Sequence, residues 1–366
     1  MKLICALFFV TIFPLLVHGQ QLIFLTAIQD SIKETSGLIY LNQKLITHND
    51  SEGRPALYEI DSISGNVIRT VAISNATNID WEDICYDSTY LYIGDFGNND
   101  GSRTDLKIYR LPITSYLTTV NDTVTVDTIQ FNYSDQTDFT PTQFSTNFDA
   151  EALISYNDSL YIFTKNWGNS WTNIYALPKT PGTYQISKID RINSQGLVTG
   201  ATYNPVSNTI LLIGYTFVSP FIIEISNFTF NEFSSGTIER YLISPPPEFS
   251  YQMEGITFLN QNQYYITAEK FGTLKSALYR LDTDKLLGLE SIEEITGLIY
   301  PNPTSYVVHI KNIDLSTVEI YDLQGILQKS SYGEQIYISD LGKGVYIIVI
   351  KNSRGDKSAT QKLIIE

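Results

Sequence analysis

The chain has 366 residues, of which 43% are hydrophobic and 13% aromatic, and its formal net charge is −15. Such a length allows one large domain and one small domain. The negative charge argues against a nucleic-acid partner, because nucleic-acid phosphates would be repelled. The same charge is compatible with cation binding and with an ordinary secreted surface.

The N-terminal segment has the pattern of a secretory signal peptide. Lys2 supplies a positive charge, Leu3 to Val17 is mostly apolar, and Gly19 is a small residue at the expected cleavage position. We predict a signal peptide at residues 1–19, handled by the Sec machinery. The apolar run is too short for a membrane span, and the sequence predicts no transmembrane segment elsewhere. Cys85 is then the only cysteine of the mature chain, and we expect it to be a buried small hydrophobe.

The body, residues 20–285, contains an internal repeat of strands. Each unit opens with a strand, at Glu34 to Leu38, Trp81 to Ile84, Ala150 to Leu153, Val198 to Ala201 and Met253 to Ile256. A second strand follows in each unit, at Lys44 to Thr47, Tyr90 to Gly94, Leu160 to Thr164, Ile210 to Gly214 and Tyr264 to Ala268. A third strand comes next, at Ala56 to Asp61, Lys107 to Leu111, Asn173 to Leu177, Phe221 to Ile225 and Ala277 to Leu281.

A fourth, outer strand is visible in the first four units, for example at Val67 to Ile73. Four antiparallel strands at this spacing predict a β-propeller. The fifth unit lacks its own fourth strand, and the strand at Leu22 to Ile28 would complete it and close the ring. We therefore predict an all-β fold with five blades, or six if the insert from Thr114 to Thr146 holds another. A linker is expected at residues 286–297.

This geometry gathers polar residues at one mouth of the central channel. The start of the first strand and the end of the second strand lie on the same rim of an antiparallel blade. The wider rim set includes Glu34, His48, Asn49 and Asp50. The candidate ligand-binding residues are Glu82, Asp83, Asp95, Asn98, Asn99, Asp149, Glu151, Lys165, Glu254, Glu269 and Lys270.

Clustered carboxylates and amide oxygens are the ligands that Ca²⁺ selects, with about six to eight oxygens around the ion. The candidate metal ligands are Glu82, Asp149, Glu151 and Glu254. The alternative is that these carboxylates only brace the blades, because buried polar groups need partners. Asp95 to Asn99 is expected to form a tight turn, because Gly and Asn permit a positive φ.

Other chemistries have fewer residues to support them. His48 is the only histidine of the predicted propeller, which excludes a histidine-rich metal site there. The pair Glu82 and Glu151 could act as the acid and base of a glycosidase if their separation is suitable. Two hypotheses remain: a module that binds a cation, a glycan or a small molecule, and a calcium-assisted hydrolase of phosphate esters or glycans.

The last segment, residues 298–366, has the alternation of a small Ig-like antiparallel β-sandwich, as in Val345-Tyr346-Ile347-Ile348-Val349. Together with its turns and its proline-rich start, the segment resembles the type A C-terminal sorting domain of cargo for the type IX secretion system of Bacteroidetes. The resemblance implies handling by the type IX apparatus and a final location outside the cell or on the outer-membrane surface. The residues that carry it are Pro301, Asn302, Pro303, Gly325, Gly344, Tyr346 and Lys362.

The body also resembles known proteins. Asp80-Trp81-Glu82-Asp83, Gly94 to Asn99 and Met253-Glu254-Gly255 resemble secreted bacterial propellers of undefined function. More distantly, the acidic strand openings look like those of phytase-like and calcium-dependent esterase propellers. The fourth unit departs from that pattern, because Val198-Thr199-Gly200 lacks a carboxylate.

Overall fold

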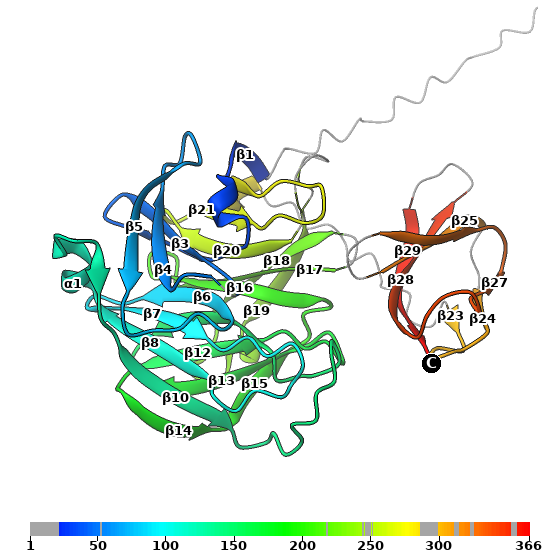
Figure 1. Ribbon diagram of the computed structural model, residues 1–366, viewed down its shortest axis with the longest axis horizontal. Coiled ribbons are helices and arrows are strands. Elements are labelled where there is room, and N and C mark those ends of the chain that lie inside the picture. The colour runs from blue at the N-terminus through cyan, green and yellow to red at the C-terminus, as the bar shows by residue number, and fades with distance from the viewer. Residues whose placement is uncertain are drawn as a thin grey trace, which may run out of the picture.

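The computed structural model describes residues 22–51, 53–216, 219–243, 245, 250, 252–285, 299–310, 315–322, 326–352 and 357–366. The predicted signal peptide and the predicted linker at 286–297 lie outside these residues. In the described residues the fold is all-β, with one short helix, α1 (Ile113–Thr118), and three 3₁₀ turns at Asp30–Ile32, Phe233–Ser235 and Thr283–Lys285. Figure 1 shows the arrangement of the sheets.

The N-terminal part of the chain forms five sheets, which confirm the strands of the predicted repeat. The first sheet contains β2 (Thr35–Leu41), β3 (Lys44–Asn49), β4 (Ala56–Ile60), β5 (Val67–Ile73) and β9 (Thr123–Val124). The second contains β6 (Trp81–Tyr86), β7 (Tyr90–Asp95), β8 (Lys107–Pro112), β10 (Asp127–Tyr133) and β14 (Gly182–Ile186). The third contains β11 (Ala150–Tyr156), β12 (Ser159–Thr164), β13 (Thr172–Pro178) and β15 (Lys188–Ile192). The fourth contains β16 (Leu197–Asn204), β17 (Thr209–Tyr215), β18 (Pro220–Ser226) and β19 (Thr237–Leu242). The fifth contains β20 (Met253–Phe258), β21 (Gln263–Ala268), β22 (Ala277–Asp282) and β1 (Leu22–Ala27).

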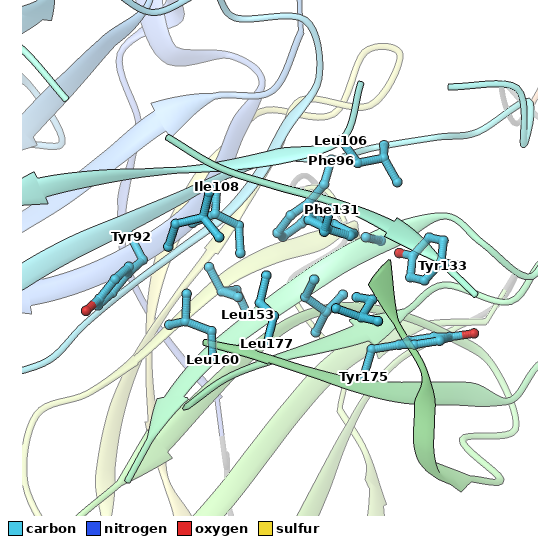
Figure 2. Packing of buried hydrophobic residues seen from close by; sticks show 14 of the residues in the cluster. Tyr92, Phe96, Leu106, Ile108, Phe131, Tyr133, Leu153, Leu160, Tyr175 and Leu177 are labelled. Atoms are coloured by element: carbon cyan, nitrogen blue, oxygen red, sulfur yellow. The ribbon is translucent and has the colours of Figure 1, made fainter. Parts of the chain in front are cut away.

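The five sheets are arranged in a ring. The first strand of each sheet contacts the first strands of the sheets before and after it, so that β2, β6, β11, β16 and β20 close on themselves. In the described residues, a buried apolar cluster lies between each pair of neighbouring sheets. Figure 2 shows the cluster between the second and third sheets, where Tyr92, Phe131 and Leu160 pack together. Cys85 belongs to this cluster and is 8% exposed, as expected for a small hydrophobe.

The ring is closed by the N-terminal strand, as the sequence predicts. Strand β1 pairs antiparallel with β22, and Leu22 lies opposite Leu281. Two outer edges are covered by strands from elsewhere in the chain: β9 adds to β5, and β14 adds to β10, both in parallel register. These additions protect backbone groups that would otherwise be left at an open edge.

The insert at residues 114–146 does not form a further sheet. Its first part completes α1, whose buried Tyr116 packs in the apolar cluster between the first and second sheets. Its strand β9 joins the first sheet, and β10 is the fourth strand of the second sheet. The remainder, up to Thr146, is loop that reaches the mouth of the ring through Phe144.

Every first strand carries a β-bulge at the same place, which the alternating sequence pattern does not reveal. The pairing with the second strand skips one residue in each sheet, namely Gly37, Glu82, Glu151, Thr199 and Glu254. A bulge inserts one unpaired residue and re-aims its side chain. Three of the five inserted residues are glutamates, and this repetition positions the candidate site.

The C-terminal part forms two further antiparallel sheets around its own apolar core. One contains β23 (Ile299–Tyr300), β24 (Val307–Ile310) and β27 (Gln335–Tyr337). The other contains β26 (Leu327–Ser331), β25 (Leu315–Tyr321), β28 (Gly344–Asn352) and β29 (Lys357–Ile365). Among the described residues, no helix is both long enough and apolar enough to cross a membrane.

Candidate functional site

The bulged glutamates meet in an acidic pocket of about 210 Å³ at one mouth of the ring. Further acids enter from the ends of strands: Asp50 follows β3, and Glu269 follows β21. The pocket is lined by Asp50, Glu82, Asn99, Phe144, Glu151, Lys165, Trp167, Tyr215, Gln252, Glu254, Glu269, Phe271 and Ile347. We use the name acidic pocket for this set.

The carboxylates lie close enough to one another to surround an ion. Glu82, Asp149 and Glu151 each offer an oxygen within 4.8 Å of the others, and Asp50, Asp80 and Glu82 form a second such group. Glu82 belongs to both groups and therefore lies at the centre of the cluster. Two carboxyl pairs, Asp50 with Asp80 and Glu82 with Glu151, are within hydrogen-bonding reach. A carboxyl pair of this kind needs either a shared proton or a bound cation.

Gly97 allows this close approach of the acids. A Cβ at Gly97 would overlap Glu82 Oε1 and Asp80 Oδ2. Gly97 itself does not have a positive φ; the glycine of this loop that does is Gly101, at 70°. Glycine is required at 97 for space rather than for a left-handed backbone.

Burial and mutual repulsion raise the pKa values of the acids. Burial raises the pKa of Asp80 to about 6 and that of Glu269 to about 7. Burial, and then repulsion from neighbouring carboxylates, also raises the pKa of Glu82 and Asp149 well above the usual range. The site therefore disfavours charge as it stands, and a cation would reverse that preference.

Lys165 is the cation that the pocket already holds. Its Nζ lies 3.0 Å from Glu151 Oε1 and sits over the rings of Trp167 and Tyr215, at 5.0 and 5.5 Å from their centroids. Burial alone would lower the pKa of Lys165, but Glu151 and the other acids raise it well above its usual value, so the group stays an ammonium. One lysine cannot neutralise so many carboxylates.

Two carboxylate oxygens in the pocket have no hydrogen-bond partner among the described residues: Glu254 Oε2 and Asp50 Oδ1. Glu254 is only 5% exposed and lines the pocket. Buried carboxylate oxygens normally have hydrogen-bond partners, and an orphaned one is able to accept from a water or to bind an ion. The orphaned Glu254 oxygen is therefore a candidate ligand atom for an ion in the pocket.

Aromatic side chains form part of the wall of the pocket, and the sequence did not point to them. Phe144 contacts Trp167 at 4.7 Å between ring centroids, and Tyr215 and Phe271 line the pocket. Trp167 Nε1 also donates to Asp149 Oδ2 at 2.8 Å. These residues lie on four different loops or strand ends, so only the closed ring brings them together. The wall combines flat apolar faces with carboxylates.

Five of the predicted ligand residues, Asp83, Asp95, Asn98, Asp149 and Lys270, lie outside the pocket lining. Asp83 is fully buried and accepts the backbone N–H groups of Leu153 at 2.8 Å and Ala201 at 3.3 Å, so it links three sheets near the axis. Asp95 is also buried and is paired with Arg103 at 3.0 Å and Lys107 at 3.6 Å.

Asn98 has a similar bracing role, because its backbone N–H donates to Asp149 Oδ1 at 2.6 Å and its side chain contacts Phe148 and Arg103. Lys270 is exposed, and its backbone N–H donates to the carbonyl of Lys33. The predicted residues that do line the pocket are Glu82, Asn99, Glu151, Lys165, Glu254 and Glu269. Asp149 adjoins the pocket, because one of its carboxylate oxygens lies near those of Glu82 and Glu151.

The sorting residues have structural roles in the C-terminal sheets. Asn302 donates to the carbonyl of Lys362 at 2.6 Å and accepts from Ile364 N–H at 2.8 Å, which pins the entry loop to β29. Tyr346 donates to the carbonyl of Gly342. Pro301 and Pro303 lie in that entry loop, and Gly344 begins β28, whereas Gly325 lies outside the described residues.

Residues 298–366 match the family of secretion system C-terminal sorting domains. This match confirms the resemblance of the segment to type IX sorting domains. The protein is therefore cargo of the type IX secretion system, delivered to the cell surface or beyond it. No curated protein matches the sequence.

The chain also resembles several solved structures, each at low sequence identity. PorZ of Porphyromonas gingivalis, an essential surface component of the type IX system, is 13% identical over 91% of this chain, with a TM-score of 0.33. The chain spans 45% of PorZ. A quinonprotein alcohol dehydrogenase-like protein of Bacteroides thetaiotaomicron is 12% identical over 92% of this chain and 69% of its own, with a TM-score of 0.33. An exo-β-1,3-galactanase of Phanerochaete chrysosporium is 11% identical, covering 94% and 93% of the two chains, with a TM-score of 0.45. At these scores the likeness carries no conclusion about activity.

Proposed function

We propose that the protein is a surface-displayed or secreted module that binds a divalent cation, Ca²⁺ in the first place, in the acidic pocket. The orphaned Glu254 Oε2 carries this proposal, together with the group formed by Glu82, Asp149 and Glu151. The donor atoms are carboxylate and amide oxygens, which hard cations prefer. A bound cation would satisfy these oxygens and remove the repulsion that raises their pKa values.

The same reasoning disfavours a soft or borderline metal. His48 is the only histidine of the ring and is fully buried against Trp81, with 5.6 Å between ring centroids. It is absent from the pocket lining. Zinc sites usually contain histidine or cysteine ligands, and Cys85 lies in the apolar cluster between two sheets.

We further infer a five-bladed propeller and an Ig-like sandwich for the two parts of the chain. The closed contacts between first strands and the five apolar layers support the blade count. The two antiparallel sheets around one core support the sandwich. In this account, the Sec machinery brings the precursor to the periplasm before type IX export.

The aromatic walls favour a glycan or another polyol as the ligand that a bound cation would hold. Trp167 and Phe144 present flat apolar faces beside the carboxylates. Sugar rings stack on such faces while their hydroxyl oxygens can complete the coordination of Ca²⁺. The predicted role is therefore recognition of a ligand bridged by the cation.

The alternative of a calcium-assisted hydrolase has less support. The paired acids of a glycosidase lie about 5 to 9.5 Å apart, so that the sugar or a water fits between them. Glu82 and Glu151 are close enough to share a hydrogen bond, which leaves no such room. For phosphate esters, the one lysine of the pocket, Lys165, is already paired with Glu151. The geometry therefore favours binding over hydrolysis.

Terbium luminescence tests the proposal, because Tb³⁺ replaces Ca²⁺ at oxygen sites and is excited by a nearby tryptophan. Trp167 is hydrogen-bonded to Asp149 and would sensitise an ion in the pocket. We expect saturable emission on excitation of tryptophan, displaced by Ca²⁺ and lost in Glu82→Gln with Asp149→Asn. Glu239→Gln, at an exposed acid of β19, is the matched control and should retain emission. Equal emission in the pocket variant and the control would refute the site.

A further inference from the structure

The sorting domain, residues 298–366, has one sheet face that is buried although it does not face its own core. Side chains alternate along β28, and Ile348 and Ile350 belong to the sorting-domain core. Ile347 and Val349 therefore face the opposite way, where an isolated sandwich would meet solvent. Both are nevertheless buried, with 6% and 8% of their surface exposed. The burial of Ile347 calls for a cover from outside the sandwich.

The acidic pocket supplies that cover. Ile347 lines the pocket together with Phe144 and Trp167. Lys362, which lies opposite Ile347 on β29, donates from Nζ to the backbone carbonyl of Trp167 at 3.4 Å. Loss of solvent lowers the pKa of Lys362, in agreement with its place in the contact. Figure 1 shows β28 and β29 on the side of the sorting domain that lies toward the ring.

We propose that the sorting domain is an intramolecular lid on the acidic pocket. In the full chain the β28–β29 face stands over the mouth through Ile347 and Lys362, so that a bulky ligand reaches the carboxylates only after the sorting domain moves away. In this proposal a small ion needs no such movement. The kind of ligand depends on the proposed function, whereas the contact between the sorting domain and the acidic pocket does not.

The contact is suited to release. Among the described residues, it includes the apolar side chain of Ile347 and the Lys362 hydrogen bond, with the positive Lys362 placed beside a pocket rich in carboxylates. Small contacts between domains permit relative motion. Attraction between Lys362 and the carboxylates would hold the lid closed at low salt, and screening of these charges at high salt would weaken the contact. Separation of the sorting domain during export would therefore expose the pocket only at the cell surface.

Cysteine labelling in the chain without its predicted signal peptide, residues 20–366, tests the lid without any ligand and without Cys5. Asn99→Cys places a thiol in the pocket, and the native Cys85 is buried and gives little background. In this background, Ile347→Glu places a negative charge against the acids. We expect it to raise the rate of labelling by a bulky maleimide about tenfold, the change that 1.4 kcal/mol produces. Lys362→Glu should act in the same direction.

Two matched variants distinguish loss of the lid contact from a general effect of a substitution on the sorting domain. Ile326→Glu makes the same substitution at an exposed position of the sorting domain and should leave the rate unchanged. Ile347→Lys changes the same residue but is attracted by the acids, so labelling should stay slow. Equal labelling rates in Asn99→Cys alone, Asn99→Cys with Ile347→Glu and Asn99→Cys with Ile326→Glu would overturn the lid. Titration of Ca²⁺ into the same proteins is a separate readout, because absence of binding would remove the cation proposal and leave the labelling result standing.

Discussion

Replacement of an acid of the pocket by its neutral isostere should stabilise the cation-free protein. Burial raises the pKa of Glu269 from 4.5 to about 7, so the native state holds this proton to a higher pH than the unfolded state does. A raised carboxyl pKa gives stability at low pH that is lost as the pH rises from about 4.5 through 7. Because glutamine cannot lose a proton, the Glu269→Gln protein does not lose this stability as the pH rises. For a shift of this size, ionisation of Glu269 lowers the free energy of unfolding by about 3 kcal/mol at pH 8 and by less than about 1 kcal/mol at pH 5.

We therefore expect the free energy of unfolding of Glu269→Gln to exceed that of the unsubstituted protein by an amount that grows by about 2 to 3 kcal/mol from pH 5 to pH 8. Urea unfolding with a chelator present measures it. Tryptophan fluorescence is a suitable probe because Trp81, Trp167 and Trp171 all lie in the ring of sheets. With saturating Ca²⁺ the unsubstituted protein should gain more stability than the variant. A Glu269→Gln protein that is less stable at pH 8 would refute the reasoning and make Glu269 a bracing residue.

Three further predictions separate the pocket from its scaffold. Gly97→Ala should lower Ca²⁺ affinity at least about tenfold and cost about 1–3 kcal/mol in unfolding free energy, because the new methyl overlaps two carboxylates; unchanged titration curves would contradict this. Asp83→Asn should cost about 2–4 kcal/mol through loss of hydrogen bonds to Leu153 and Ala201, with Ca²⁺ affinity unaltered. Burial lowers the pKa of His48 to about 4, so its contribution to stability is present above pH 6.5 and lost as the pH falls toward 4. As the pH falls from 7 to 4, the free energy of unfolding of His48→Phe should therefore rise by about 3 kcal/mol relative to that of the unsubstituted protein. A difference in unfolding free energy that does not change with pH would argue against burial of a neutral histidine.

The sequence predicts the strands because each one is short, apolar and bounded by turn residues. Its repeat correctly assigns the closing strand, since Leu22 to Ala27 pairs with β22 at the far end of the ring. The regularity of the units makes such a prediction possible: each sheet has to bury its faces against the next. Residues 114–146 break the regularity, and their strands join two existing sheets instead of forming a new one.

The candidate site is predicted less completely, for reasons that concern particular residues. A bulge at Glu82 or Glu254 leaves no mark on a pattern of alternating residues, yet it decides that these side chains enter the pocket. Asp95 occupies an equivalent rim position, but Arg103 folds back from the following loop and neutralises it. Phe144 and Phe271 come from loops whose positions depend on the closed ring, and no local pattern identifies them.

Calorimetric titration of Ca²⁺ into the chelator-treated full chain at pH 7, in two buffers of different ionisation enthalpy, tests the central claim most directly. Glu269, with a pKa of about 7, and its more strongly shifted neighbours hold protons that a cation has to displace. The account predicts saturable binding with release of protons, seen as a heat that differs between the buffers, and loss of both in Glu151→Gln with Glu254→Gln. Absence of binding in the unsubstituted protein, or binding that survives in this double variant, would contradict a cation site in the acidic pocket.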